Sequence, residues 1–110
     1  MYARVWRVVI LPGKMEEFLA LTNAMLPILR RQRGFGGLFV LRSGPGERLE
    51  VTVVSMWASL EALQDSETPT FRQEVVKFLA LCEHRPAMRE EEVIMSDFPS
   101  SSLDDSVTRF

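Results

Sequence analysis

Residues 51–63, VTVVSMWASLEAL, restrict the fold more than any other stretch of this chain. The first half is β-branched and apolar, which is typical of a buried strand. The second half begins at Ser59, a residue type that caps helix N-termini, and continues with good helix formers. Trp57 stands between the halves. The pattern predicts a strand that passes directly into a helix, and we expect any pocket to lie near this junction.

The other elements follow from changes in hydrophobic period and from the glycines and prolines between them. The expected strands cover residues 2–11, 38–43, 49–57 and 90–98, with a tight Gly-Pro-Gly turn at residues 44–46. The expected helices run from 14 to 34, from 59 to about 65, and from 69 to about 85. Pro27 lies inside the first helix and predicts a kink or a break near residues 23–27. Thr68 is the expected cap of the last helix, with Pro69 as its first residue.

This β-α-β-β-α-β order is typical of the ferredoxin-like, split βαβ arrangement, an α+β fold. It predicts a four-stranded antiparallel sheet with the helices on one face. The uncovered face of a monomeric sheet is usually polar. Strands 2–11 and 49–57, however, carry apolar side chains on both faces. Because monomers rarely expose such a patch, we expect two sheets to pack face to face in a homodimer.

The composition excludes several classes of protein. The chain has 110 residues and a formal net charge of -2, which gives no electrostatic basis for binding nucleic acid or an anionic membrane. No apolar run approaches the roughly 20 residues that span a bilayer. Cys82 is the only cysteine, which suits a reducing compartment, so we expect a cytoplasmic protein. We expect one domain over residues 1–98 and a polar tail over residues 99–110.

The sequence resembles the antibiotic biosynthesis monooxygenase (ABM) domain family of the dimeric α+β barrel group. The resemblance covers about residues 2–98 and rests on Pro-Gly-Lys at 12–14, Gly-Phe-Gly-Gly at 34–37, residues 55–63, and Thr-Pro-Thr-Phe at 68–71. It implies a homodimer through the sheet face. It also implies a cofactor-independent monooxygenase that acts on a small aromatic or quinol-type compound. The alternative is a non-catalytic module of the same fold that binds a small ligand or serves dimerisation.

The resemblance does not supply catalytic residues. Haem-degrading members use an Asn on the first strand, a Trp on the second helix and a His on the last helix. By spacing, those places hold Trp6, about Ser66 and about Val75 here. Quinol-oxidising members commonly carry histidines around the second helix, where this chain has Asp65 and Thr70. We therefore expect no haem or other cofactor, and the catalytic residues stay unassigned.

The candidate substrate-binding residues are aromatic or polar side chains placed near the expected pocket: Trp6, Asn23, Trp57 and His84. Aromatic side chains commonly wall ligand pockets, although both tryptophans also suit the core. His84 is the sole histidine, at the end of the last helix, and it cannot share a helix face with Cys82 to bind a metal. We expect no metal site.

Arg4 shares a strand face with Trp6 inside an otherwise apolar sheet. A buried guanidinium needs an acid, a carbonyl, a ligand or the dimer edge as its partner. Glu50 and Asp97 are the acids considered as its partners. The two interpretations are a structural ion pair and an anchor for the substrate.

Overall fold

The computed structural model describes residues 1–43 and 49–97. The expected turn at 44–46 and the expected tail at 99–110 lie outside these residues. In chain order the elements are β1 (Tyr2–Val9), α1 (Met15–Arg30), β2 (Phe35–Ser43), β3 (Glu50–Trp57), α2 (Leu60–Asp65), α3 (Pro69–Leu79) and β4 (Ala87–Glu92).

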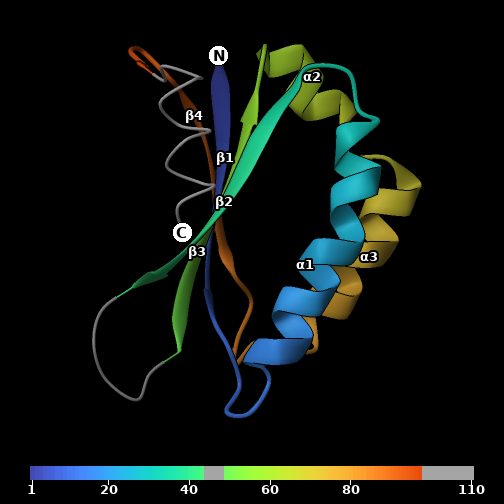
Figure 1. The fold of residues 1–110 in the computed structure, drawn as a ribbon, viewed down its shortest axis with the longest axis vertical. Coiled ribbons are helices and arrows are strands. Elements are labelled where there is room, and N and C mark those ends of the chain that lie inside the picture. Colours follow the sequence, from blue (N-terminus) through green and yellow to red (C-terminus); the bar gives the residue numbers. More distant parts are fainter. Residues whose placement is uncertain (44–48, 98–110) are drawn as a thin grey trace, which may run out of the picture.

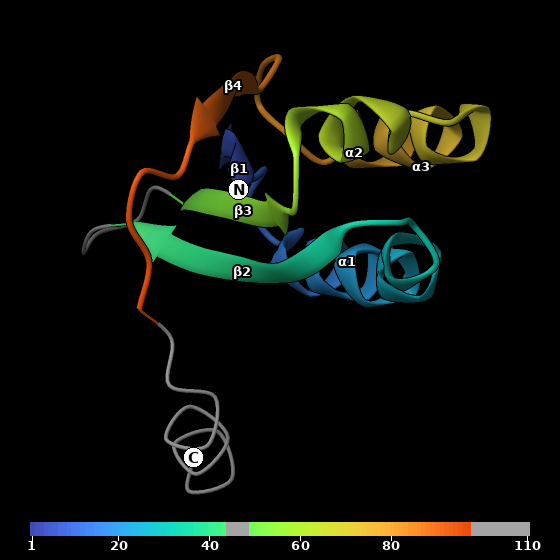
Figure 2. The ribbon, with the colours of Figure 1, turned by 90° about the horizontal axis from the view of Figure 1, so that it is seen from above.

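The four strands form one antiparallel sheet in the order β2-β3-β1-β4. Helices α1, α2 and α3 lie against the same face of the sheet (Figures 1 and 2), and no helix from residues 1–43 and 49–97 lies on the opposite face. This is the ferredoxin-like α+β arrangement that the element order predicts. None of the helices in the described part of the chain is long and apolar enough to cross a membrane.

The strand register decides which side chains face the helices. Arg4, Trp6 and Val8 of β1 lie opposite Ser55, Val53 and Val51 of β3. Residues paired in this way point to the same face of an antiparallel sheet. One core cluster forms around Val8, Val51 and Phe18 of α1, and a second forms around Trp57. The helix-side face of β1 and β3 therefore supplies both clusters.

The helix starts agree with the predicted caps. The Ser59 hydroxyl accepts a hydrogen bond from the Ala62 N–H at 3.1 Å, and the Thr68 hydroxyl accepts one from the Phe71 N–H at 3.2 Å. Pro69 is the first residue of α3, as expected. α1 ends at Arg30 rather than at residue 34, and it continues through Pro27, so of the predicted kink or break the break is absent.

The last strand and the end of the last helix were predicted wrongly. β4 covers Ala87–Glu92 rather than 90–98, because its partner β1 begins at Tyr2, which pairs with Glu92. After the bond from the Val93 N–H to the Met1 carbonyl, β1 offers no further backbone partner, and Ile94 is 92% exposed. α3 ends at Leu79, so Cys82 lies beyond the helix, where it forms a bridge with Ile10.

Candidate functional site

A cavity of about 80 Å³ lies between the sheet and the helices. β1 and β3 form one wall and α1 and α3 form the other, so the register described above places Trp6, Val53 and Trp57 in its lining. Phe71 and Val75 of α3 lie on the other side. The lining is almost entirely apolar, which favours an uncharged, largely hydrophobic ligand.

A shallower depression adjoins the cavity on the outside. It measures about 230 Å³ and is bordered by Glu67, Arg72 and Met88 together with three side chains that also line the cavity. The shared side chains are Trp6, Phe71 and Val75. This wall of two aromatic rings and one valine therefore separates the inner cavity from the outer surface between α3 and β4.

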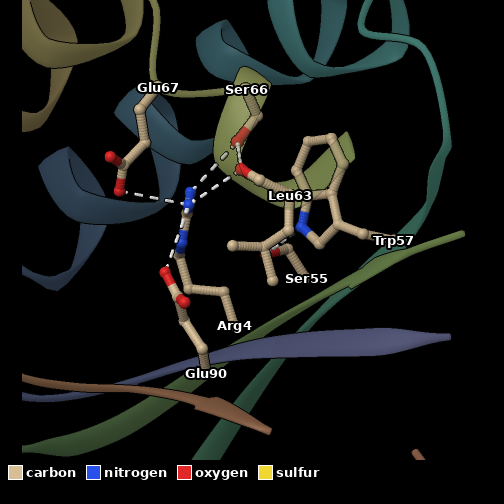
Figure 3. A network of polar contacts seen from close by, with 7 residues as sticks. All are labelled: Arg4, Ser55, Trp57, Leu63, Ser66, Glu67 and Glu90. Carbon is tan, nitrogen blue, oxygen red and sulfur yellow. Dashed lines mark hydrogen bonds and ion pairs between the residues drawn. The ribbon is translucent and has the colours of Figure 1, made fainter. Parts of the chain in front are cut away.

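Of the described residues that line the cavity, Arg4 is the one with a basic side chain, and it is only 1% exposed. Its Nη1 donates to the Ser66 hydroxyl at 3.2 Å, and its Nη2 donates to the Leu63 carbonyl at 3.0 Å and to Glu67 Oε1 at 3.2 Å. Figure 3 shows the guanidinium pointing from the strand toward the end of α2, with the Glu90 carboxylate alongside. The Nη2–Glu90 Oε1 distance is 4.0 Å.

Burial lowers the pKa of the Arg4 guanidinium, and the carboxylates of Glu67 and Glu90 act in the opposite direction. Because the pKa of an arginine lies far above neutral pH, the guanidinium stays charged. The guanidinium also lies over the Phe71 ring, 5.4 Å from its centroid. Among the described residues, Arg4 Nε is the buried side-chain nitrogen or oxygen that has no hydrogen-bond partner.

The expected acid partners of Arg4 were wrong. Glu50 pairs with Val9, at the opposite end of β1 from the Arg4 guanidinium. Asp97 is exposed and follows β4 by five positions, beyond the paired part of the sheet. Glu67 sits between α2 and α3, and Glu90 lies directly opposite Arg4 on β4. The ion-pair interpretation therefore describes Arg4 correctly, but with different acids.

Trp57 is fully buried at the end of β3. Its Nε1 donates to the Ser55 hydroxyl at 3.0 Å, and its ring meets Phe35 edge to face at 5.3 Å between centroids. Ser55 is itself buried, so the indole N–H is satisfied inside the core. Trp57 thus anchors the strand-to-helix junction and also contributes to the cavity wall.

The structure brings two of the four candidate residues together. Trp6 and Trp57 both line the cavity. Asn23 is exposed on α1 and is absent from the lining. His84 is also exposed, and it lies beyond α3 rather than in its last turn; its Nδ1 is 3.3 Å from the Arg85 carbonyl oxygen.

Sequence reasoning did not select Glu67, Phe71 or Val75, which border the cavity or its outer depression. Val75 had one signal, because by spacing it lies about where the resemblance implies a histidine in haem-degrading family members. Ser66, about where it implies their tryptophan, accepts a hydrogen bond from Arg4. Within residues 1–43 and 49–97, no three His, Cys, Asp or Glu side chains gather as a metal site would require.

The sheet order, the helices on one face and the apolar cavity beneath them define a ferredoxin-like α+β domain. The sequence profile of the antibiotic biosynthesis monooxygenase family matches residues 1–75, and the chain belongs to this family. A search of curated proteins finds none that matches.

Several solved structures share the fold. A mutant of SnoaB, a cofactor-independent oxygenase from Streptomyces nogalater, is 17% identical and superposes with a TM-score of 0.75 over 90% of this chain and 97% of that one. Rv0793 from Mycobacterium tuberculosis is 20% identical with a TM-score of 0.70 over 90% and 98%. A protein of unknown function from Nitrosomonas europaea is 18% identical with a TM-score of 0.72 over 90% and 94%. At these identities the likeness establishes the fold alone.

Proposed function

We propose that this chain is a cytoplasmic, cofactor-independent monooxygenase that acts on a small aromatic or quinol-type compound. The observation that carries the proposal is the apolar, aromatic-walled cavity between sheet and helices in a domain of the ABM family. The SnoaB likeness adds support, because that protein is described as a cofactor-independent oxygenase.

The oxidation of a quinol by O₂ suits a site with few polar side chains. When O₂ converts a quinol to a hydroxyquinone, one oxygen atom enters a ring C–H and the other leaves as water. The substrate supplies all the electrons that O₂ takes up, so no external reductant is needed. The protein's part is to bind the ring, to orient it and to exclude water from it. Trp6, Phe71 and Val75 provide such an environment.

The cavity alone is too small for a ring. Its volume of about 80 Å³ is below the roughly 150 Å³ of an apolar protein cavity that binds benzene. The ligand would therefore extend past the wall of Trp6, Phe71 and Val75 into the outer depression. Binding would require these three side chains to change rotamer.

The proposed working form is a homodimer that packs through the sheet face without helices. Val5, Leu41 and Val54 belong to that face, because Val5 pairs with Val54 and Leu41 pairs with Thr52. Leu41 is 52% exposed, and none of the helices in the described part of the chain covers this face (Figure 2). A second copy offers the same surface and would bury these apolar side chains by twofold symmetry.

The test is oxygen uptake in the presence of purified protein and 1,4-dihydroxynaphthalene, with ¹⁸O₂ and mass analysis of the product. We expect uptake above the protein-free rate and one ¹⁸O atom in the product. Val75→Phe would place a larger side chain in the cavity and abolish the increase in the rate of oxygen uptake. Val76→Phe is the matched control, since Val76 is 64% exposed and does not line the cavity. Uptake no faster than in buffer contradicts the proposal.

One observation favours the non-catalytic alternative, a small-ligand-binding module. Among the described residues that line the cavity there is no histidine and no carboxylate, and the ionisable side chains are Arg4 and Cys82. A ligand titration, carried out beside the oxygen-uptake measurement, distinguishes the two functions. A ligand that binds to wild-type protein but not to Val75→Phe, without oxygen uptake, identifies a binding module.

A further inference from the structure

Among the described residues, the buried polar side-chain atoms of the cavity lining have hydrogen-bond partners within the protein, with one exception. The Thr22 hydroxyl donates to the Phe18 carbonyl at 2.9 Å, and the Cys82 thiol donates to the Phe78 carbonyl at 3.3 Å. The Ser55 hydroxyl accepts from the Trp57 indole. These three groups give a ligand little to bind.

The exception is Arg4 Nε, which is buried and has no acceptor. Native proteins rarely leave a buried donor unpaired, because its desolvation is then uncompensated. The two terminal nitrogens of Arg4 are fixed by Leu63, Ser66 and Glu67, so the guanidinium cannot turn to satisfy Nε without breaking those bonds. The acceptor that completes Arg4 must therefore come from outside this network.

We propose that Arg4 Nε–H donates a hydrogen bond to an oxygen atom of the ligand, and that Arg4 orients the ligand in the cavity. This inference rests on the proposed function and narrows its substrate class to flat aromatic compounds that carry a carbonyl or hydroxyl oxygen. The Phe71 ring, which lies against the same guanidinium, would pack on the ring of such a ligand. Arg4 is thus a positioning and specificity residue.

Charge favours a neutral oxygen over a carboxylate. Glu67 and Glu90 both lie near the Arg4 guanidinium, at 3.2 and 4.0 Å, so its single positive charge is already compensated. A carboxylate ligand would add a third negative charge beside one arginine. A carbonyl or phenolic oxygen accepts the Nε–H without that repulsion.

The test compares ligands of one skeleton: 1-tetralone, which has a carbonyl, tetralin, which lacks it, and 1,2,3,4-tetrahydro-1-naphthoate, which carries a carboxylate. Affinities come from titrations followed by ¹H–¹⁵N spectra of the full chain. These spectra also report the arginine Nε–H resonances directly. Arg4→Lys assigns the Arg4 signal by its loss, and Arg31→Lys is the matched control, because Arg31 is exposed at the end of α1 and does not line the cavity.

We expect 1-tetralone to bind at least about tenfold more tightly than tetralin. We also expect only the ketone to move the Arg4 Nε–H signal downfield. Arg31→Lys should preserve both results. If Arg4→Lys does not fold, the selectivity of the wild-type protein between the ketone and the hydrocarbon still decides the question.

Equal binding of ketone and hydrocarbon with an unmoved Nε–H signal overturns the role of Arg4 and leaves the apolar pocket of the proposed function intact. Tightest binding by the carboxylate overturns the neutral-oxygen class. No binding by any of the three overturns both the anchor and the aromatic pocket.

Discussion

Ser66 shows how much of the site depends on a single buried hydroxyl. It is 1% exposed, accepts from Arg4 Nη1 at 3.2 Å and donates to the Leu63 carbonyl. Arg4 in turn belongs to β1, so this hydroxyl joins the sheet to the end of α2. A side chain that only filled space there would leave the arginine short of an acceptor.

Ser66→Ala should therefore lower the free energy of unfolding by about 1–3 kcal/mol, the usual cost of leaving a buried polar group unsatisfied. Urea denaturation followed by tryptophan fluorescence measures the change. Ser96→Ala is the control: Ser96 is exposed, and its loss should stay within about 0.5 kcal/mol. Equal effects of the two substitutions would show that the Ser66–Arg4 bond adds nothing to stability.

The buried environment of Cys82 determines the reactivity of its thiol. It is buried, its thiol donates to the Phe78 carbonyl, and burial raises its pKa. The thiolate is the reactive form, so alkylation of the native protein at neutral pH should be slower than in denaturant, by at least about tenfold. Labelling with iodoacetamide, followed by mass spectrometry, measures both rates. Equal rates would contradict the assigned burial.

The raised pKa of Cys82 also makes the stability of the fold depend on pH. The thiol holds its proton more tightly in the folded protein than in the unfolded chain. Its contribution to the free energy of unfolding is therefore fully present below the unfolded pKa. This contribution is lost as pH rises from the unfolded pKa, near the ordinary thiol value of 9.0, through the raised pKa of the folded protein. Cys82→Ala should remove this part of the alkaline loss of stability, which urea unfolding across that range would detect.

At the scale of elements, the turn from α1 into β2 depends on Gly34. Gly34 has φ of 84°, and a Cβ placed on it would lie 2.6 Å from the Ala62 Cβ on α2. Gly13 has a similar φ of 78° but nothing within 4 Å of such a Cβ. The two positions thus differ in packing while sharing the left-handed backbone.

Gly13→Ala should cost about 1–2 kcal/mol from backbone strain alone. Gly34→Ala should cost a further 1–3 kcal/mol or so, because α2 must move away from the turn. Adding Ala62→Gly should recover the packing part and leave the strain. Thermal and urea unfolding of the four proteins measure these differences. Similar costs at the two glycines would mean that α2 shifts without penalty.

Local signals predicted the helix starts well, because a cap is decided by neighbouring residues. Ser59 and Thr68 behave as their residue types suggest. β4 was placed wrongly because its sequence, AMREEE, carries little apolar pattern. Its position follows from the hydrogen bonds that β1 offers, and the more apolar residues 93–97 lie past the start of β1. Strand pairing of this kind depends on two segments that are far apart in the sequence, so the local pattern of one segment does not predict it.

The site was less predictable than the fold for the same reason. Trp6 and Trp57 were selected as aromatic residues on strands, and both line the cavity. The acids beside Arg4 come from the α2–α3 connection and from β4, 63 and 86 positions away in numbering. Strand alternation put Arg4 on the right face, but which carboxylates meet it depends on how the end of α2 docks on the sheet and on the β1–β4 register. In that arrangement Arg4 Nε has no hydrogen-bond partner among the described residues.

At the scale of the whole molecule, the sheet face without helices sets the expected assembly. Leu41 is half-exposed on that face, beside Thr52 and on the same side as Val54. The wild-type chain should therefore have a mass in solution of twice 12.6 kDa. Leu41→Glu would bury two carboxylates in the dimer interface, one from each copy, and should weaken association at least about 100-fold.

Light scattering coupled to size exclusion at micromolar concentration measures the masses of both proteins. Val76→Glu is the matched control, because Val76 is 64% exposed on α3, in the helical layer on the opposite side of the sheet. It adds the same charge to an apolar surface position and should leave the dimer unchanged. Circular dichroism of each variant separates loss of assembly from loss of folding. A wild-type mass of 12.6 kDa, or a dimeric Leu41→Glu variant, would show that the apolar sheet face does not join two copies.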